Sequence, residues 1–275
     1  AWTSLKLEPA LAQRLHRLLP SGSVPRLPHP MIRSLSFPRP APLLCLLLTS
    51  ALPAQQEVRF ADLGRMVNIQ GWSEHGSTVQ LADLDGDGSL DAVLTSILRV
   101  GLARNDGAGG MRLDSAGRLP AGISAFSARI GDFDGDGDLD LFLANPFRQP
   151  AIHLLQNRGD GSFIDVSATK LPPCTDEVRA TAAGDFDQDG DLDLLLGTEG
   201  GADRMLLNDG SGAFQWAPSA ALPPHLDDCW WTEAADFDGD GLPDLLMGHR
   251  TAMRLYLNRG GATFVDASHQ LPAVY

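Results

Sequence analysis

Short acidic segments and short apolar segments follow one another along this chain, and the pattern occurs four times. Each acidic segment is followed directly by three consecutive apolar residues, at 92–94, 141–143, 194–196 and 245–247. Unbroken apolar runs of this length, bounded by turn-forming residues, are typical of strands buried on both faces. The pattern therefore predicts one fully buried strand after each acidic segment.

A further strand and a tight turn are expected after each apolar run. The next segment ends on an asparagine with a glycine two residues later, at Asn105, Asn157, Asn208 and Asn258. Asn and Gly tolerate left-handed backbone conformations, so this spacing indicates a hairpin turn. A last short strand is expected around Met111, Phe163, Phe214 and Phe264. Each unit then closes on Leu-Pro, at Pro120, Pro172, Pro223 and Pro272.

The closing prolines are 52, 51 and 49 residues apart, so the period does not depend on the acidic segments. Four short strands repeated at this period are the pattern of a propeller blade, and stacked neighbours bury the faces that one sheet cannot bury alone. Helical repeats are the alternative, but 29 Gly and 19 Pro leave no segment long enough for paired helices. We therefore predict an all-β protein, a β-propeller of four-stranded antiparallel blades.

Four acidic nonapeptides, at 83–91, 132–140, 185–193 and 236–244, carry the candidate chemistry. Each has carboxylates at positions 1, 3, 5 and 9 and a glycine at position 6, which suits a loop that curls around calcium. A solvated acidic turn is the alternative. An EF-hand would need Glu at position 12, where this chain has Leu94, Leu143, Leu196 and Met247. The predicted carboxylate ligands are Asp83, Asp85, Asp87, Asp91, Asp132, Asp134, Asp136, Asp140, Asp185, Asp187, Asp189, Asp193, Asp236, Asp238, Asp240 and Asp244.

These loops, the apolar strand and the Asn-x-Gly-x-Gly-x-Phe turn at 157–163 resemble FG-GAP/VCBS repeats, found in the integrin α-subunit N-terminal propeller and in many bacterial secreted proteins. The resemblance covers 57–275, with repeats at about 73–120, 121–172, 173–223 and 224–272. It implies a propeller, seven-bladed in the best-known members, with about one calcium ion per repeat. It also implies a carbonyl ligand at position 7, from Ser89, Asp138, Asp191 and Leu242. The fourth loop departs from the other three at positions 7 and 8, where it has Leu242 and Pro243. Because position 7 contributes its carbonyl, we expect this site to survive the change.

Four repeats are expected to form part of a larger ring. Phe60-Ala-Asp-Leu matches the outer-strand pattern of Phe163-Ile-Asp-Val, as if it ended a blade whose inner strands lie elsewhere. The chain reaches Tyr275 just after an outer strand, so a fragment of a seven-bladed ring is the simplest interpretation. A self-closed four-bladed ring is the alternative.

The N-terminal stretch differs in composition and predicts export. Residues 31–54 resemble a secretory signal, with Arg33 and Arg39 before the apolar run 43–48, which is too short to span a bilayer. A buried helix is the alternative for that run, and residues 1–30 are an unassigned basic, Pro-rich extension. We expect a secreted, periplasmic or cell-surface protein without a transmembrane segment. Cys174 and Cys229 lie before consecutive inner strands, so a disulfide between adjacent blades is conceivable.

Charge and motifs favour binding over catalysis. The net charge of −14 disfavours nucleic acid and anionic membranes as partners. The sequence contains no metalloprotease, nucleophile-elbow or phosphate-loop motif, and a lone histidine such as His153 or His225 is more often a packed residue than a ligand. We therefore expect a scaffold that binds an extracellular protein or glycan. The alternative is an accessory domain of a larger exported polysaccharide lyase or hydrolase.

A binding face is expected where the residues before the inner strands converge. The candidate ligand-binding residues are Phe126, Arg179, Trp230 and Trp231, and the loops after the apolar strands add Arg148, Glu199, His249 and Arg250. Aromatic and Arg side chains are frequent anchors for partners. Packing between blades is the alternative role for the two tryptophans.

Overall fold

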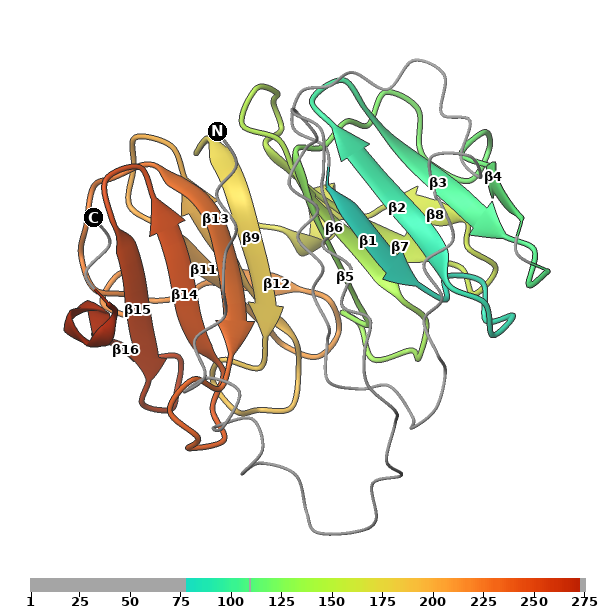
Figure 1. Ribbon diagram of the computed structural model, residues 1–275. Helices are drawn as coiled ribbons and strands as arrows, with labels where there is room; N and C mark the ends of the chain where they lie inside the picture. The colour runs from blue at the N-terminus through green and yellow to red at the C-terminus, as the bar shows by residue number, and fades with distance from the viewer. Residues whose placement is uncertain (1–77, 109, 273–275) are drawn as a thin grey trace, which may run out of the picture. The chain divides into compact units, whose positions relative to one another are not determined.

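The computed structural model describes residues 78–108 and 110–272, all of which belong to one unit of the chain, Leu52–Tyr275. Within this range the chain forms four antiparallel four-stranded sheets, each with its strands in sequence order (Figure 1). The predicted all-β architecture and the four-stranded units are thus confirmed. The predicted extension, signal segment and Phe60 strand lie outside the described residues.

Each sheet corresponds to one repeat of the sequence. Sheet 1 contains β1 (Val79–Ala82), β2 (Asp91–Ser96), β3 (Arg99–Asn105) and β4 (Met111–Leu113). Sheet 2 contains β5 (Ser127–Gly131), β6 (Asp140–Ala144), β7 (Ile152–Asn157) and β8 (Phe163–Asp165). Sheet 3 contains β9 (Val178–Gly184), β10 (Asp193–Thr198), β11 (Arg204–Asn208) and β12 (Phe214–Trp216). Sheet 4 contains β13 (Cys229–Ala235), β14 (Asp244–His249), β15 (Met253–Asn258) and β16 (Phe264–Asp266). Two single helical turns, α3 (Ser167–Lys170) and η1 (Ser268–Gln270), follow β8 and β16.

The second strand of each sheet is the apolar run predicted from the sequence. All residues of β2, β6 and β10 are buried, because successive side chains point to opposite faces and both faces are covered. In β10, Leu194 and Leu196 pack toward sheet 2, whereas Leu195 packs toward sheet 4. The position-12 residues of the acidic segments lie in these strands, so an EF-hand is excluded.

The core consists of apolar layers between successive sheets. The first strands contact one another in order, β1 with β5, β5 with β9 and β9 with β13. Phe133 of the second acidic loop meets Phe214 of β12 edge to face, with ring centroids 6.0 Å apart. Phe186 of the third loop meets Phe264 of β16 in the same way, at 5.8 Å. The first three acidic segments therefore place their second residue, Leu84, Phe133 or Phe186, in the layer shared with the following sheet.

The suggested disulfide between Cys174 and Cys229 is wrong. Both are buried, free thiols. They belong to different layers, because Cys174 packs between sheets 2 and 3 and Cys229 packs between sheets 3 and 4.

Candidate metal centres

The four acidic nonapeptides form loops of the same local structure between the first and second strands of each sheet. We call them loop 1 (83–91), loop 2 (132–140), loop 3 (185–193) and loop 4 (236–244). The glycine at position 6 has a positive φ in every loop, from 87° at Gly88 to 102° at Gly190, which confirms the predicted turn. At position 4 three loops have Gly, and loop 3 has Gln188 at a φ of 71°.

Backbone N–H groups hold the carboxylates at positions 1 and 5. The position-1 carboxylate accepts the N–H of the position-6 glycine, as at 2.8 Å between Gly88 and Asp83 Oδ2. The position-5 carboxylate accepts the N–H two residues later, as at 2.8 Å between Ser89 and Asp87 Oδ1. Equivalent bonds occur in loops 2, 3 and 4. The loops are therefore preformed by their own hydrogen bonds.

The position-9 aspartate of each loop is buried and fixed by two backbone donors. In loop 3, Asp193 Oδ2 accepts the N–H of Phe186 at 2.9 Å and Oδ1 accepts the N–H of Asn208 at 2.9 Å. Asp91, Asp140 and Asp244 have the same two contacts within their own repeats. Since each carboxylate oxygen has a second lone pair, these bonds leave capacity for a cation.

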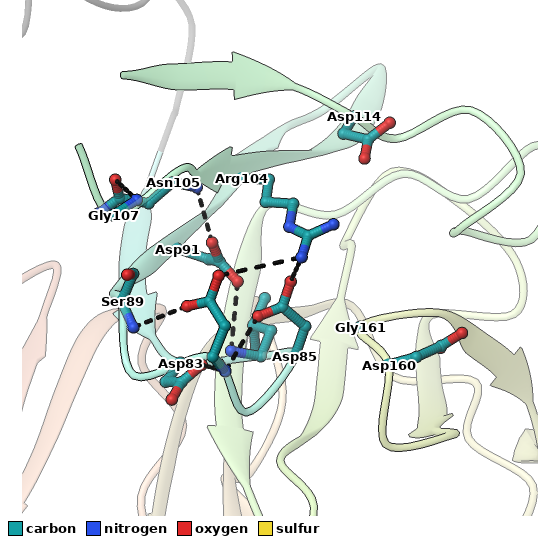
Figure 2. Close-up of polar contacts among 12 residues, drawn as sticks. Asp83, Asp85, Ser89, Asp91, Arg104, Asn105, Gly107, Asp114, Asp160 and Gly161 are labelled. Atoms are coloured by element: carbon teal, nitrogen blue, oxygen red, sulfur yellow. Dashed lines mark hydrogen bonds and ion pairs between the residues drawn. The ribbon is translucent and has the colours of Figure 1, made fainter. Parts of the chain in front are cut away.

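In each loop, three carboxylates present oxygens within 4.8 Å of one another. They come from positions 1, 3 and 9 in loops 1, 3 and 4, and from positions 1, 3 and 5 in loop 2. Figure 2 shows this convergence for Asp83, Asp85 and Asp91. The side chains of Asp138 and Asp191 at position 7 are not part of these groups, and the carbonyl ligands predicted at Ser89, Asp138, Asp191 and Leu242 stay a prediction.

The electrostatics of these groups fit a bound cation. The pKa of Asp140 and that of Asp193 are raised to about 7, mainly by burial. The neighbouring carboxylates at positions 3 and 5 also raise the pKa, whereas the hydrogen bonds from backbone N–H groups lower it. Asp185 Oδ1 is buried without a hydrogen-bond partner. Hard oxygen donors with unmet negative charge are the ligand set that calcium prefers.

Guanidinium groups lie against two of the loops. Arg104 of β3 pairs with Asp85 in loop 1, with Nη2 and Oδ2 2.5 Å apart (Figure 2). Arg259 pairs with Asp238 and Asp240 in loop 4, at 3.1 and 3.3 Å. In these two loops the carboxylates thus already attract a positive charge.

The strand-ending asparagines have a function that the sequence did not reveal. Asn157 Nδ2 donates to the carbonyl of Leu84, the second residue of loop 1, at 2.9 Å. Asn208 and Asn258 donate in the same way to Phe133 of loop 2 and Phe186 of loop 3, at 2.8 and 2.9 Å. None of these asparagines has a positive φ. Each therefore ties its sheet to the acidic loop of the preceding sheet, and the turn itself is made by the glycine.

The candidate ligand-binding residues lie at the opposite strand ends from the acidic loops. Phe126 meets Phe147 edge to face at 6.2 Å, and the Arg179 guanidinium lies 5.9 Å from both rings. Arg179 also pairs with Glu199. The structure thus brings together candidates from sheets 2 and 3.

On sheet 4, Trp230 and Trp231 of β13 are 52% and 43% exposed. Trp231 lies over Gly248, where a Cβ atom would clash with its indole ring, so packing explains part of its position. His249, expected on the same face, is buried instead. It contacts Asp203 and His225.

Comparisons with known proteins agree with this architecture. A family model described as an FG-GAP-like repeat matches residues 83–143, 132–196, 185–247 and 236–274, so the chain belongs to this family. Cartilage acidic protein 1 of Xenopus tropicalis is 38% identical over 55 residues, which are 20% of this chain and 8% of that protein. The chain therefore spans a small part of the curated relative that it matches.

Solved structures show a similar fold. A lectin of Agrocybe aegerita that recognises non-reducing terminal N-acetylglucosamine has a TM-score of 0.52 and 21% identity, over 71% of this chain and 52% of the lectin. The V. cholerae biofilm matrix protein Bap1 has a TM-score of 0.38 and 21% identity, over 68% of this chain and 27% of Bap1, which is too weak to add to the argument. The lectin supports a propeller-like arrangement of the sheets. Among the described residues, no helix is long and apolar enough to cross a membrane.

Proposed function

We propose that this chain is an exported propeller domain that is stabilised by calcium and binds an extracellular protein or glycan. The observation that carries the calcium proposal is the convergence of three carboxylates in every loop, together with the raised pKa values of the buried Asp140 and Asp193. Bound calcium would neutralise this charge and connect the first and second strands of each sheet. The contacts between successive first strands support a ring of blades that includes these four sheets.

The calcium proposal is tested by titrating the full chain with calcium in an isothermal calorimeter. Asp134→Ala should reduce the number of bound ions by one, because position 3 belongs to the converging group of loop 2. Asp160→Ala is the matched control, since this aspartate lies in the turn after β7, outside the converging groups, and its carboxylate accepts the N–H of Ser162 two residues away. Equal stoichiometry in the wild-type chain and Asp134→Ala would show that loop 2 is not a calcium site.

The binding proposal rests on aromatic and Arg side chains, exposed or half-buried, at the strand ends opposite the loops. Phe126, Phe147 and Arg179 form one group and Trp230 adds a second exposed ring. Rings and guanidinium groups of this kind stack on sugars and anchor protein partners. The lectin with a similar fold makes a glycan the first class to test.

A glycan array probed with the full chain in calcium tests this proposal. A specific signal should disappear in Trp230→Ala or Arg179→Ala, and should persist in Val265→Ala, an exposed apolar residue of β16. Signals that are the same in all three variants would contradict this binding face. The accessory-domain alternative predicts the same loops, so it is distinguished by the reading frame after Tyr275, where a catalytic domain would follow.

A further inference from the structure

A second kind of polar cluster lies between sheets 3 and 4, away from the acidic loops. Asp203 immediately precedes β11, His249 ends β14 and His225 lies in the connection between the two sheets. Asp203 Oδ2 is 2.8 Å from His225 Nε2 and 2.9 Å from His249 Nε2, and the two Nε2 atoms are 2.7 Å apart. Since β14 begins at the last residue of loop 4 and ends at His249, the cluster is at the far end of the sheet from that loop.

Protons alone do not explain three such short distances. An imidazole nitrogen carries one proton at most, and its N–H points along a single direction in the ring plane. If both histidines donate to Asp203, two N–H groups face each other at 2.7 Å. If only one donates, the unprotonated Nε2 atom of the other histidine faces Asp203 Oδ2 with both lone pairs opposed. If neither donates, three lone pairs face one another without a positive charge. A cation shared by the three atoms removes this conflict.

The spacing of the three atoms matches metal coordination. Ligand atoms bound at about 2.0–2.1 Å lie about 2.9 Å apart when they subtend a right angle at the metal, and about 3.3 Å apart in a tetrahedron. The observed 2.7–2.9 Å is close to the right-angle spacing and shorter than the tetrahedral one, so it fits two histidines and one carboxylate on one face of a metal ion with more than four ligands. Imidazole ligands favour transition metals over calcium.

Neighbouring groups orient two of the three ligands. His225 Nδ1 is 3.2 Å from the carbonyl of Pro223 and 3.1 Å from the hydroxyl of Tyr256, so the Nδ1 proton has an acceptor and the Nε2 lone pair is directed at Asp203 and His249. Asp203 Oδ1 accepts the N–H of Thr198 at 2.8 Å, which leaves Oδ2 for the cluster. A second hydrogen-bond partner on the non-ligating nitrogen is the usual support of a metal-binding histidine.

The fold itself does not require these residues. Five residues before the strand-ending asparagine, the other repeats have Val100, Ile152 and Met253 where the third has Asp203. Five residues after the last loop aspartate, they have Ser96, Asn145 and Thr198 where the fourth has His249. Sheets 3 and 4 thus carry a buried carboxylate, Asp203, and a buried imidazole, His249, at positions where the other repeats have neither. The two side chains contact each other, which points to a ligand.

We propose that Asp203, His225 and His249 bind a divalent transition-metal ion, with Zn²⁺ as the probe of choice, and that this ion is structural. The side chains of Asp203 and His249 are fully buried and that of His225 is 4% exposed, so the site is closed to substrates. Cys229 Sγ lies within 4.8 Å of Asp203 and His249, and is not needed as a ligand in this proposal. The ion would join sheets 3 and 4 at the end of sheet 4 where β13 begins, with Trp230 and Trp231 near it, and where β14 ends at His249.

The experiment measures Zn²⁺ binding to the full chain by calorimetry in millimolar calcium, which keeps Zn²⁺ out of the acidic loops. We expect one equivalent of tightly bound Zn²⁺ and a higher melting temperature. His249→Asn and Asp203→Met place residues that other repeats tolerate at these positions, so both should fold. Each should lower the Zn²⁺ affinity about 100-fold or more, which exceeds the effect of losing a supporting hydrogen bond.

The matched control is His153→Asn. His153 pairs with Asp165 at 3.1 Å, a histidine–aspartate contact without a second histidine, so its loss should leave Zn²⁺ affinity unchanged. Co²⁺ bound to the wild-type chain should show absorption bands of nitrogen and oxygen ligation that are absent in His249→Asn. Failure of the wild-type chain to bind Zn²⁺ in calcium, or equal affinity in the wild-type chain and His249→Asn, would overturn the proposal.

Discussion

Asn157 offers the sharpest test of how the sheets are joined, because it is buried and its side chain makes four hydrogen bonds. Its Nδ2 donates to the carbonyls of Leu84 and Leu139, at 2.9 and 3.0 Å, and its Oδ1 accepts the N–H groups of Gly159 and Gly161, both at 3.1 Å. Two of these bonds shape the turn within sheet 2. One of the others reaches loop 1 in the preceding sheet.

Two substitutions separate these roles. Asn157→Ala removes all four bonds, and at about 1 kcal/mol each the free energy of unfolding should fall by about 4 kcal/mol. Asn157→Asp keeps an acceptor for both glycines but directs a carboxylate oxygen at two carbonyls. We therefore expect Asn157→Asp to be at least as destabilising as the alanine variant, because two donors are lost and a buried charge lacks a partner.

Urea unfolding in saturating calcium measures both variants, with the midpoint and slope compared to those of the wild-type chain. If Asn157 served the turn alone, Asn157→Asp would lie within about 1 kcal/mol of wild type. That result would refute the inference that this side chain joins sheet 2 to loop 1.

Phe186→Ala in loop 3 should lower the free energy of unfolding in urea by about 3–5 kcal/mol, because this ring is 0% exposed. Phe237→Ala at the same position of loop 4 should lower it by less than about 1 kcal/mol, because that ring is 44% exposed. Similar losses in the two variants would contradict the described layers. Chelation of calcium should lower the melting temperature, and added calcium should restore it. At a calcium concentration of a hundredfold Kd, each site should add about 2.7 kcal/mol to the free energy of unfolding. An unchanged melting curve would argue against structural calcium. In chelator, stability should fall as the pH rises from about 4 to about 7, because the folded pKa of Asp140 and Asp193 is raised above the ordinary value of 3.8 and the folded state binds the extra protons. Thermal melts of Asp140→Asn should show a shallower pH dependence, and no change in slope would contradict the raised pKa.

Local features of the fold could be predicted from the sequence because they repeat. The buried strand at 194–196, the glycine turn at Gly190 and the hairpin after Asn208 each depend on residues close together in the chain. The convergence of loop carboxylates follows from nine-residue spacing in the same way.

Contacts between repeats could not be predicted, because the partners are 22 to 75 residues apart and no local pattern links them. The asparagines indicated a turn, and nothing in their spacing showed that Asn208 reaches Phe133. His225 resembled an ordinary packed residue until the fold placed it beside Asp203 and His249. Cysteine spacing was compatible with a disulfide, but the two thiols belong to different layers.

The asparagine contacts give the array a direction. Loops 1, 2 and 3 are each held by their own sheet through the position-9 carboxylate and by the next sheet through a carbonyl at position 2. An ion bound in one loop therefore stabilises a hairpin one repeat further along, and by thermodynamic reciprocity that hairpin strengthens ion binding in the loop. Successive sites should thus fill with positive cooperativity between nearest neighbours, so that calcium concentration controls the rigidity of the whole row of sheets over a narrow range.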